Sequence, residues 1–115
     1  MRDFKAIGFW EDAHQLAIEI YNLTKTFPKS EVYGITSQLR RASLSVPTNI
    51  AEGCGRESIN ELKRYMVVSN GSITEVQYLL MFCYDIDLIQ KKRYEALNEK
   101  VISIKKRLTV YLKKL

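Results

Sequence analysis

The sequence predicts an all-α protein, an up-down-up-down antiparallel four-helix bundle that forms one domain over residues 1–115. Apolar residues recur at steps of three and four in four successive segments, and no segment alternates apolar and polar residues as a half-buried strand does. The connections between these segments are short, and four helices with one apolar face each bury those faces against one another. We expect the helices over residues 9–27, 30–53, 58–86 and 92–115.

The first predicted helix carries its apolar stripe up to a proline. The stripe consists of Trp10, Ala13, Ala17, Ile20, Thr24 and Phe27. Pro28 follows directly and ends the helix, because proline has no backbone N–H and crowds the preceding turn.

The second predicted helix continues through a proline. Its stripe consists of Ile35, Leu39, Ala42 and Val46. Pro47 then removes one backbone donor and crowds the carbonyl of Ser43, so we expect a kink there. The stripe resumes at Ile50 in a shifted register and ends at Gly53, a residue that suits a helix terminus.

The third and fourth helices are recognised from a cap and a heptad pattern. Ser58 and Glu61 form a capping box in front of an apolar stripe made of Ile59, Leu62, Met66, Ser69, Ile73, Val76, Leu80 and Cys83. After a turn over residues 87–91, a heptad seam follows with Tyr94, Leu97, Val101, Ile104, Leu108, Tyr111 and Leu115.

Positive charge is concentrated in the last predicted helix. Residues 91–115 contain nine Lys or Arg and two Glu, a net +7, whereas the whole chain carries +5. The position before each seam residue forms a row roughly 30 Å long, made of Arg93, Lys100, Arg107 and Lys114, with Lys106 beside it. Such a row could follow the phosphates of a nucleic acid, or it could be a solvated helix face whose long side chains shield the core.

A second basic group is spread over the second and third helices. It consists of Arg40, Arg41, Arg56, Lys63 and Arg64. These side chains could bind RNA phosphates, or they could pair internally with Glu52, Glu57, Glu61 and Glu75. Adjacent helical residues point about 100° apart, so Arg40 and Arg41 cannot both face inward, and we expect one structural arginine and one that is free for a partner.

Small and aromatic residues predict self-association. Gly71 lies inside the third helix, where glycine costs roughly 1 kcal/mol relative to alanine, so we expect another helix to pack closely there, either the second helix or one from a neighbouring subunit. The chain also has more aromatic residues than four seams need. The residues predicted for the subunit interface are Pro47, Gly71, Ser72 and Tyr78.

A set of short motifs identifies a family. It consists of Phe27-Pro28, Glu31, Tyr33-Gly34-Ile35, Ser37-Gln38-Leu39-Arg40-Arg41-Ala42, Ser45-Val46-Pro47, Asn49-Ile50-Ala51-Glu52-Gly53, Arg56, Gly71-Ser72 and Glu75. We call these residues the motif set. On them the chain resembles the four-helix bundle proteins encoded in intervening sequences of bacterial 23S rRNA, the S23-type ribosomal protein family, over Trp10 to about Leu115. That family is similar in turn to the accessory variability protein of diversity-generating retroelements, and the resemblance implies a ring, a homopentamer.

Signals for catalysis, metal binding and export are weak. His14 is the only histidine, and a single Glu11-x-x-His14 pair cannot build a di-metal centre. Cys54 lacks a supporting histidine, and Cys54 and Cys83 form no CxxC pair. We therefore expect no enzyme, no catalytic or metal site and no cofactor. No signal peptide or apolar run approaching about 20 residues is present, which favours a cytoplasmic protein without a membrane partner.

The leading hypothesis is a basic homo-oligomer that presents its charge to RNA or to an RNA–protein complex. The alternative is a protein-binding scaffold or adaptor with no nucleic-acid role, in which the surplus apolar surface binds the partner. A nucleic-acid hydrolase is disfavoured because acid–base groups are lacking. Salt dependence separates the first two hypotheses, because phosphate contacts weaken steeply with ionic strength.

Overall fold

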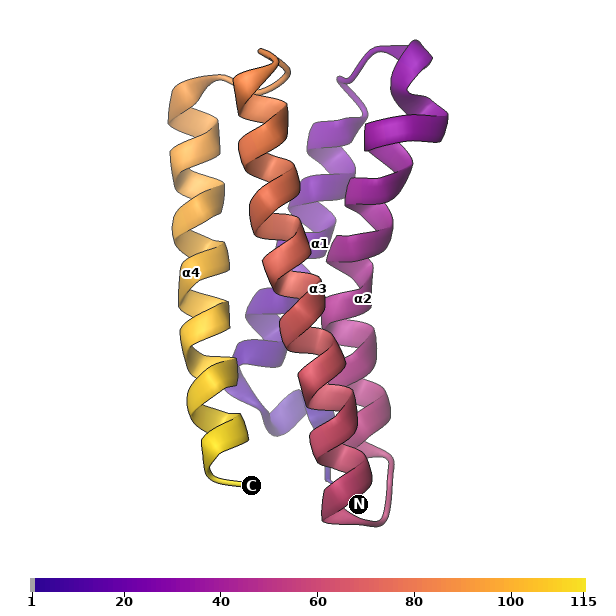
Figure 1. The fold of residues 1–115 in the computed structure, drawn as a ribbon, viewed down its shortest axis with the longest axis vertical. Helices are drawn as coiled ribbons and strands as arrows, with labels where there is room; N and C mark the ends of the chain where they lie inside the picture. Colours follow the sequence, from indigo (N-terminus) through magenta and orange to yellow (C-terminus); the bar gives the residue numbers. More distant parts are fainter. Residues whose placement is uncertain (1) are drawn as a thin grey trace.

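Four long helices run side by side in the computed structural model, which describes residues 2–115 (Figure 1). Residue 1 of the predicted domain lies outside the described part. The helices are α1 (Gly8–Thr24), α2 (Ser37–Cys54), α3 (Ile59–Asp85) and α4 (Lys91–Lys113). Because residues 2–115 contain no strand, the all-α prediction is confirmed.

The helices form a closed arrangement in which each touches two others. α2 packs most extensively on α3, α3 packs on α4, and α1 contacts both α2 and α4. Figure 1 shows the α1–α2 and α3–α4 connections at one end of the molecule and the α2–α3 connection at the other. The extents of 43 × 24 × 19 Å describe an elongated body along the helix axes.

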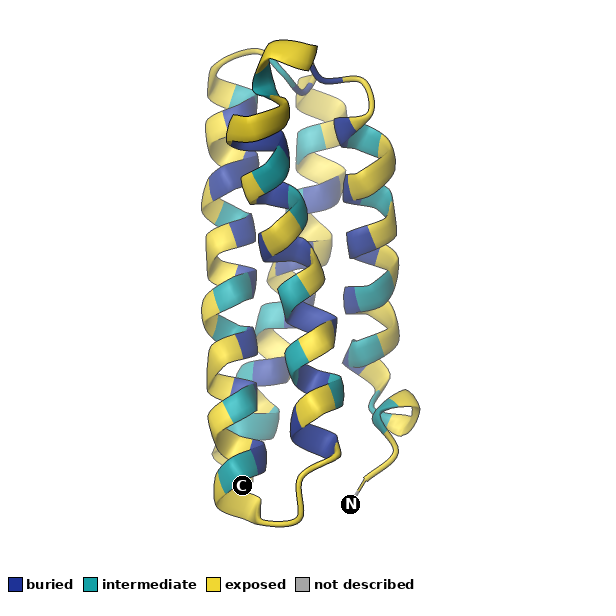
Figure 2. Ribbon diagram, turned by 90° about the vertical axis from the view of Figure 1, so that its right-hand side faces the viewer, coloured by how far each residue is buried: buried dark blue, intermediate teal, exposed yellow. Residues whose placement is uncertain are grey.

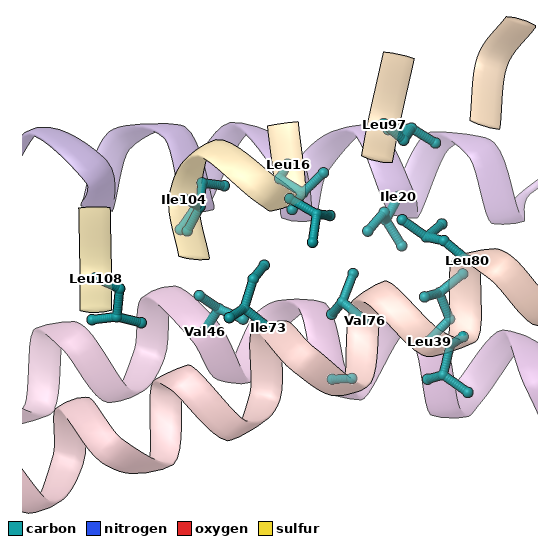
Figure 3. Packing of buried hydrophobic residues seen from close by; sticks show 14 of the residues in the cluster. Leu16, Ile20, Leu39, Val46, Ile73, Val76, Leu80, Leu97, Ile104 and Leu108 are labelled. Atoms are coloured by element: carbon teal, nitrogen blue, oxygen red, sulfur yellow. The ribbon is translucent and has the colours of Figure 1, made fainter. Parts of the chain in front are cut away.

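The apolar stripes meet along the centre of the bundle. Figure 2 shows buried residues on the inward side of each helix, and Figure 3 shows side chains of all four helices converging there. Fully buried members include Leu16, Ile20, Leu39, Val46, Ile73, Leu80, Leu97, Ile104 and Leu108. Ile59 is an exception, 43% exposed in the first turn of α3, where no neighbouring helix covers it.

The second helix begins later than predicted. Residues 30–36 were expected to be helical, but Lys29–Glu31 forms a 3₁₀ turn and Val32–Thr36 forms a π-helical turn. The cause lies at Gly34, whose φ of −115° and ψ of −115° are not helical. The apolar spacing around Ile35 is compatible with either geometry, so periodicity alone could not detect this irregular segment.

Pro47 lies inside α2 and is buried. Side chains from two neighbouring helices bind the carbonyls beside it. The indole Nε1 of Trp10 donates to the carbonyl of Pro47 at 3.2 Å, and the Ser69 hydroxyl donates to the carbonyl of Val46 at 2.9 Å. These bonds anchor the proline-containing turn to α1 and α3, while the kink itself stays a prediction.

Gly53 and Gly71 differ sharply in their surroundings. A Cβ at Gly53 would lie 2.9 Å from the Cβ of Tyr65 and 3.3 Å from the carbonyl of Leu62, so α2 and α3 approach closely there because Gly53 has no side chain. A Cβ at Gly71 would meet nothing within 4 Å. Of the two packing partners expected for Gly71, α2 of the same chain is therefore excluded.

The two glycines should respond oppositely to alanine. Gly53→Ala should lower the free energy of unfolding by about 1–3 kcal/mol because α3 must move away. Gly71→Ala should raise it by up to about 1 kcal/mol, because alanine favours the helix and the site is open. Chemical denaturation followed by circular dichroism measures both, and a Gly53→Ala protein as stable as wild type would contradict the close contact.

Candidate nucleic-acid interface

The predicted basic row of α4 lies beside acidic residues of α1. The Lys100 ammonium contacts the two carboxylate oxygens of Glu19 at 2.6 and 2.7 Å. The Arg107 guanidinium donates through Nη2 to one carboxylate oxygen of Asp12. Both pairs are accessible to solvent, where an ion pair contributes about 0–1 kcal/mol, so they do little for stability but neutralise half of the predicted row.

The other predicted cations of α4 are not compensated by a neighbouring carboxylate. Within residues 2–115, Arg93, Lys106 and Lys114 form no ion pair, and all three are exposed. Lys106 and Lys114 border a shallow groove of about 370 Å³ between the start of α1 and the end of α4. The free positive charge of α4 is therefore carried by fewer residues than the sequence pattern indicates.

Arg40 has a structural role. Its Nε donates to the hydroxyl of Thr24 at 2.7 Å, and its Nη2 donates to the carbonyl of Tyr21 at 3.2 Å. The guanidinium also lies 4.5 Å from the centre of the Tyr21 ring. Arg40 thus satisfies groups in the last turn of α1 and ties that turn to α2, and its assignment to RNA binding stays a prediction.

Arg41 is free, as expected if only one of the adjacent arginines is structural. Its single side-chain contact is a long one, 3.5 Å from Nη2 to the hydroxyl of Ser37. No carboxylate of residues 2–115 pairs with it. Arg41 borders a groove of about 540 Å³ between α2 and α3, which we call the motif groove; its lining residues are Tyr33, Gly34, Ser37, Gln38, Arg41, Ala42, Ser45, Ser72 and Glu75.

The second basic group is not one patch. Arg56 lies beyond the C-terminal end of α2, roughly 24 Å along the helix axis from Arg40. Its Nη2 donates to the hydroxyl of Tyr65 at 2.7 Å and lies 3.7 Å from a carboxylate oxygen of Glu52. Lys63 and Arg64, in the first turns of α3, are exposed and form no ion pair within residues 2–115.

The predicted interface residues occupy different environments. Pro47 is buried within the subunit, which argues against direct contact with a neighbour, and its place in the interface stays a prediction. Ser72 lies in the motif groove, where its hydroxyl and that of Ser45 are 2.8 Å apart. Gly71 and Tyr78 are accessible on the outward side of α3, next to further exposed apolar side chains. We call this set the α3 stripe: Val67, Gly71, Tyr78, Met81 and Phe82.

The thiols and the histidine serve packing. Cys54 and Cys83 are buried and unpaired. Burial raises the pKa of both thiols, that of Cys83 to about 11, which keeps them neutral near pH 7. His14 stacks on the Trp10 ring with centroids 5.2 Å apart. Within residues 2–115 no three metal-ligating side chains come together. None of the helices in this part of the chain has the length and hydropathy of a membrane span.

Arg40 and Arg41 provide a matched test of these assignments. Arg40→Ala should lower the free energy of unfolding by about 1–2 kcal/mol, because the last turn of α1 loses two hydrogen bonds to a charged group. Arg41→Ala should change it by less than about 0.5 kcal/mol, as expected for an exposed side chain. Thermal or urea denaturation compares them, and equal effects would contradict the division of roles.

Comparisons with known proteins agree with the motif set. The family model of the 23S rRNA-intervening sequence protein matches residues 5–110. A crystal structure of a protein with unknown function from the S23 ribosomal protein family of Bacteroides thetaiotaomicron has the same fold, with a TM-score of 0.86 and 22% identity over 91% of this chain and 98% of that chain. A search among curated proteins finds no match. Because the family model covers nearly all of the sequence, the chain belongs to the 23S rRNA-intervening sequence protein family.

Proposed function

We propose that this protein is a non-enzymatic, cytoplasmic RNA-binding module that acts as a homo-oligomeric ring of five subunits. The observation that carries the proposal is the net +7 of residues 91–115. The cations there that are exposed and form no ion pair within residues 2–115 are Lys91, Lys92, Arg93, Lys106, Lys113 and Lys114. The family description, which refers to 23S rRNA, supports RNA or an RNA–protein complex as the partner.

The binding would be electrostatic. Lysine and arginine side chains on a convex helix neutralise phosphates and release counterions, which gives affinity with little sequence preference. The unpaired cations of one subunit are spread over α2, α3 and α4, so few of them can contact one stretch of RNA at a time. A ring presents several copies of α4 to the same RNA, and multivalency converts weak contacts into useful affinity.

The α3 stripe supports the homo-oligomer. Tyr78 is 56% exposed and Val67 is equally so, and Phe82 lies 6.4 Å from Tyr78 between ring centres. Gly71 within this stripe leaves open space for a neighbour's helix. Five subunits follow from the family resemblance rather than from the surface.

The alternative function, a protein-binding scaffold or adaptor with no nucleic-acid role, also draws on exposed apolar side chains. Ile18, Tyr21 and Leu44 form such a surface on α1 and α2, away from the α3 stripe. In that case the basic helix would steer partners without binding phosphate.

The free cations of α4 should dominate RNA binding. Replacing Arg93, Lys106 and Lys114 together with glutamine should weaken binding to a structured RNA and reduce the salt slope of log K by about two. Fluorescence anisotropy at salt concentrations between about 50 and 200 mM measures both quantities.

A matched variant removes three cations that are already paired. Replacing Arg56, Lys100 and Arg107 with glutamine changes the net charge equally but should reduce the affinity and the slope less. Wild-type binding that does not depend on salt would favour the scaffold function, and equal effects of the two triple variants would show that only net charge matters.

The assembly should depend on the α3 stripe. Wild-type protein should show five times the 13.4 kDa chain mass in light scattering at micromolar concentration. Gly71→Leu should lower that mass, because leucine fills the space that a neighbouring helix would occupy, while the α3 helix itself is favoured by the change.

Asn22→Leu places the same leucine side chain at an exposed position of α1 and serves as the control for an added surface leucine. It should leave the mass unchanged. A monomeric wild-type protein would refute the ring, and an unchanged mass for Gly71→Leu would move the interface elsewhere.

A further inference from the structure

We propose that the motif groove binds an unpaired ribonucleotide of the RNA, an inference that rests on the proposed function and names a specific site for it. All nine residues that line this groove belong to the motif set. Other members of the motif set, such as Leu39, Val46 and Ile50, are fully buried and serve the core. Of the nine lining residues, Ala42 is buried and belongs to the core, whereas the other eight are exposed or partly exposed.

The groove contains two charged groups of opposite sign that the subunit leaves unpaired. Within residues 2–115, neither the Arg41 guanidinium nor the Glu75 carboxylate forms an ion pair. Arg40, one residue away, shows the contrast because its donors are committed to α1. A guanidinium fork binds a phosphate bidentately, so Arg41 suits the phosphate of a nucleotide.

Tyr33 provides a stacking surface at the rim. Its side chain is 99% exposed, although a tyrosine ring normally gains free energy by burial. The π-helical turn Val32–Thr36, with its non-helical Gly34, presents this residue beside Arg41 at the same groove. Exposed aromatic rings next to basic side chains are the common means of binding unpaired bases, because every base has a face that can stack.

The other residues of the groove suit the base and the ribose of a nucleotide. Ala42, Ser45 and Ser72 are small, and the two serine hydroxyls, 2.8 Å apart, bridge α2 and α3. Glu75 can accept hydrogen bonds from a base amino group or a 2′-hydroxyl. The volume of about 540 Å³ lies within the roughly 300–1,000 Å³ of small-molecule sites.

The ligand class is an unpaired rather than a paired nucleotide. In a duplex the base faces are stacked on one another and cannot reach Tyr33. A second copy of the chain would be expected to use apolar surface, whereas the groove is lined mainly by charged groups, hydroxyls and an amide.

The test compares a labelled single-stranded oligoribonucleotide with a fully paired RNA duplex of equal charge, using the full chain in anisotropy titrations. Tyr33→Ala should weaken single-strand binding about tenfold and leave duplex binding unchanged. Tyr33→Phe keeps the ring and should bind the single strand nearly as well as wild type. Arg41→Gln should weaken single-strand binding and reduce its salt slope by about 0.7.

The outcomes separate this inference from the proposed function. If Tyr33→Ala binds the single strand like wild type while the α4 triple variant loses affinity, the groove assignment is wrong and RNA binding stands. If wild-type protein binds neither RNA, both are wrong. If Tyr33→Ala lowers the oligomer mass without RNA, the groove is an interface between copies and the nucleotide site is refuted.

Discussion

The close packing of α2 on α3 is the constraint on which the other features of this molecule depend. At Gly53 a missing side chain allows the backbones to approach, and further along the pair small hydroxyls replace bulky side chains at Ser45 and Ser72. The Ser69 hydroxyl bonds a carbonyl beside Pro47. Hydrogen bonds of fixed geometry therefore set the register of the two helices, where apolar contacts alone would permit sliding.

That register decides which surfaces the protein presents. It aligns the side chains of α2 and α3 that border the motif groove, and it turns the α3 stripe outward. The basic helix α4 lies on the opposite side of α3 from α2 (Figure 1). The motif groove and the α3 stripe adjoin on α3, because Glu75 of the groove lies four residues after Gly71 and three before Tyr78 of the stripe.

Periodicity and caps predict the four helices of this chain, because both act between residues close in sequence, although α1 ends at Thr24 and not at the predicted residue 27 in front of Pro28. Ser58 accepts from the backbone N–H of Glu61 as its position indicates. Contacts between distant residues could not be predicted in the same way: Glu19 and Asp12 face α4 from positions 81 and 95 residues away from their partners. The predicted start of the second helix was wrong because the backbone angles of Gly34 interrupt the helix, while the spacing of the apolar residues around it does not change. The exposure of Tyr33 depends on that same irregular turn.

The carboxylates of Asp12 and Glu19 have a further consequence for any polyanion that reaches α4. They already compensate the charges of Lys100 and Arg107, so a phosphate that binds there must displace a carboxylate, which is left unpaired and repels the polyanion. The net attraction at these two positions is therefore weaker than at an unpaired cation. The two carboxylates compete with any phosphate for Lys100 and Arg107. A free anion cannot displace them, whereas a polyanion that other contacts hold against α4 can.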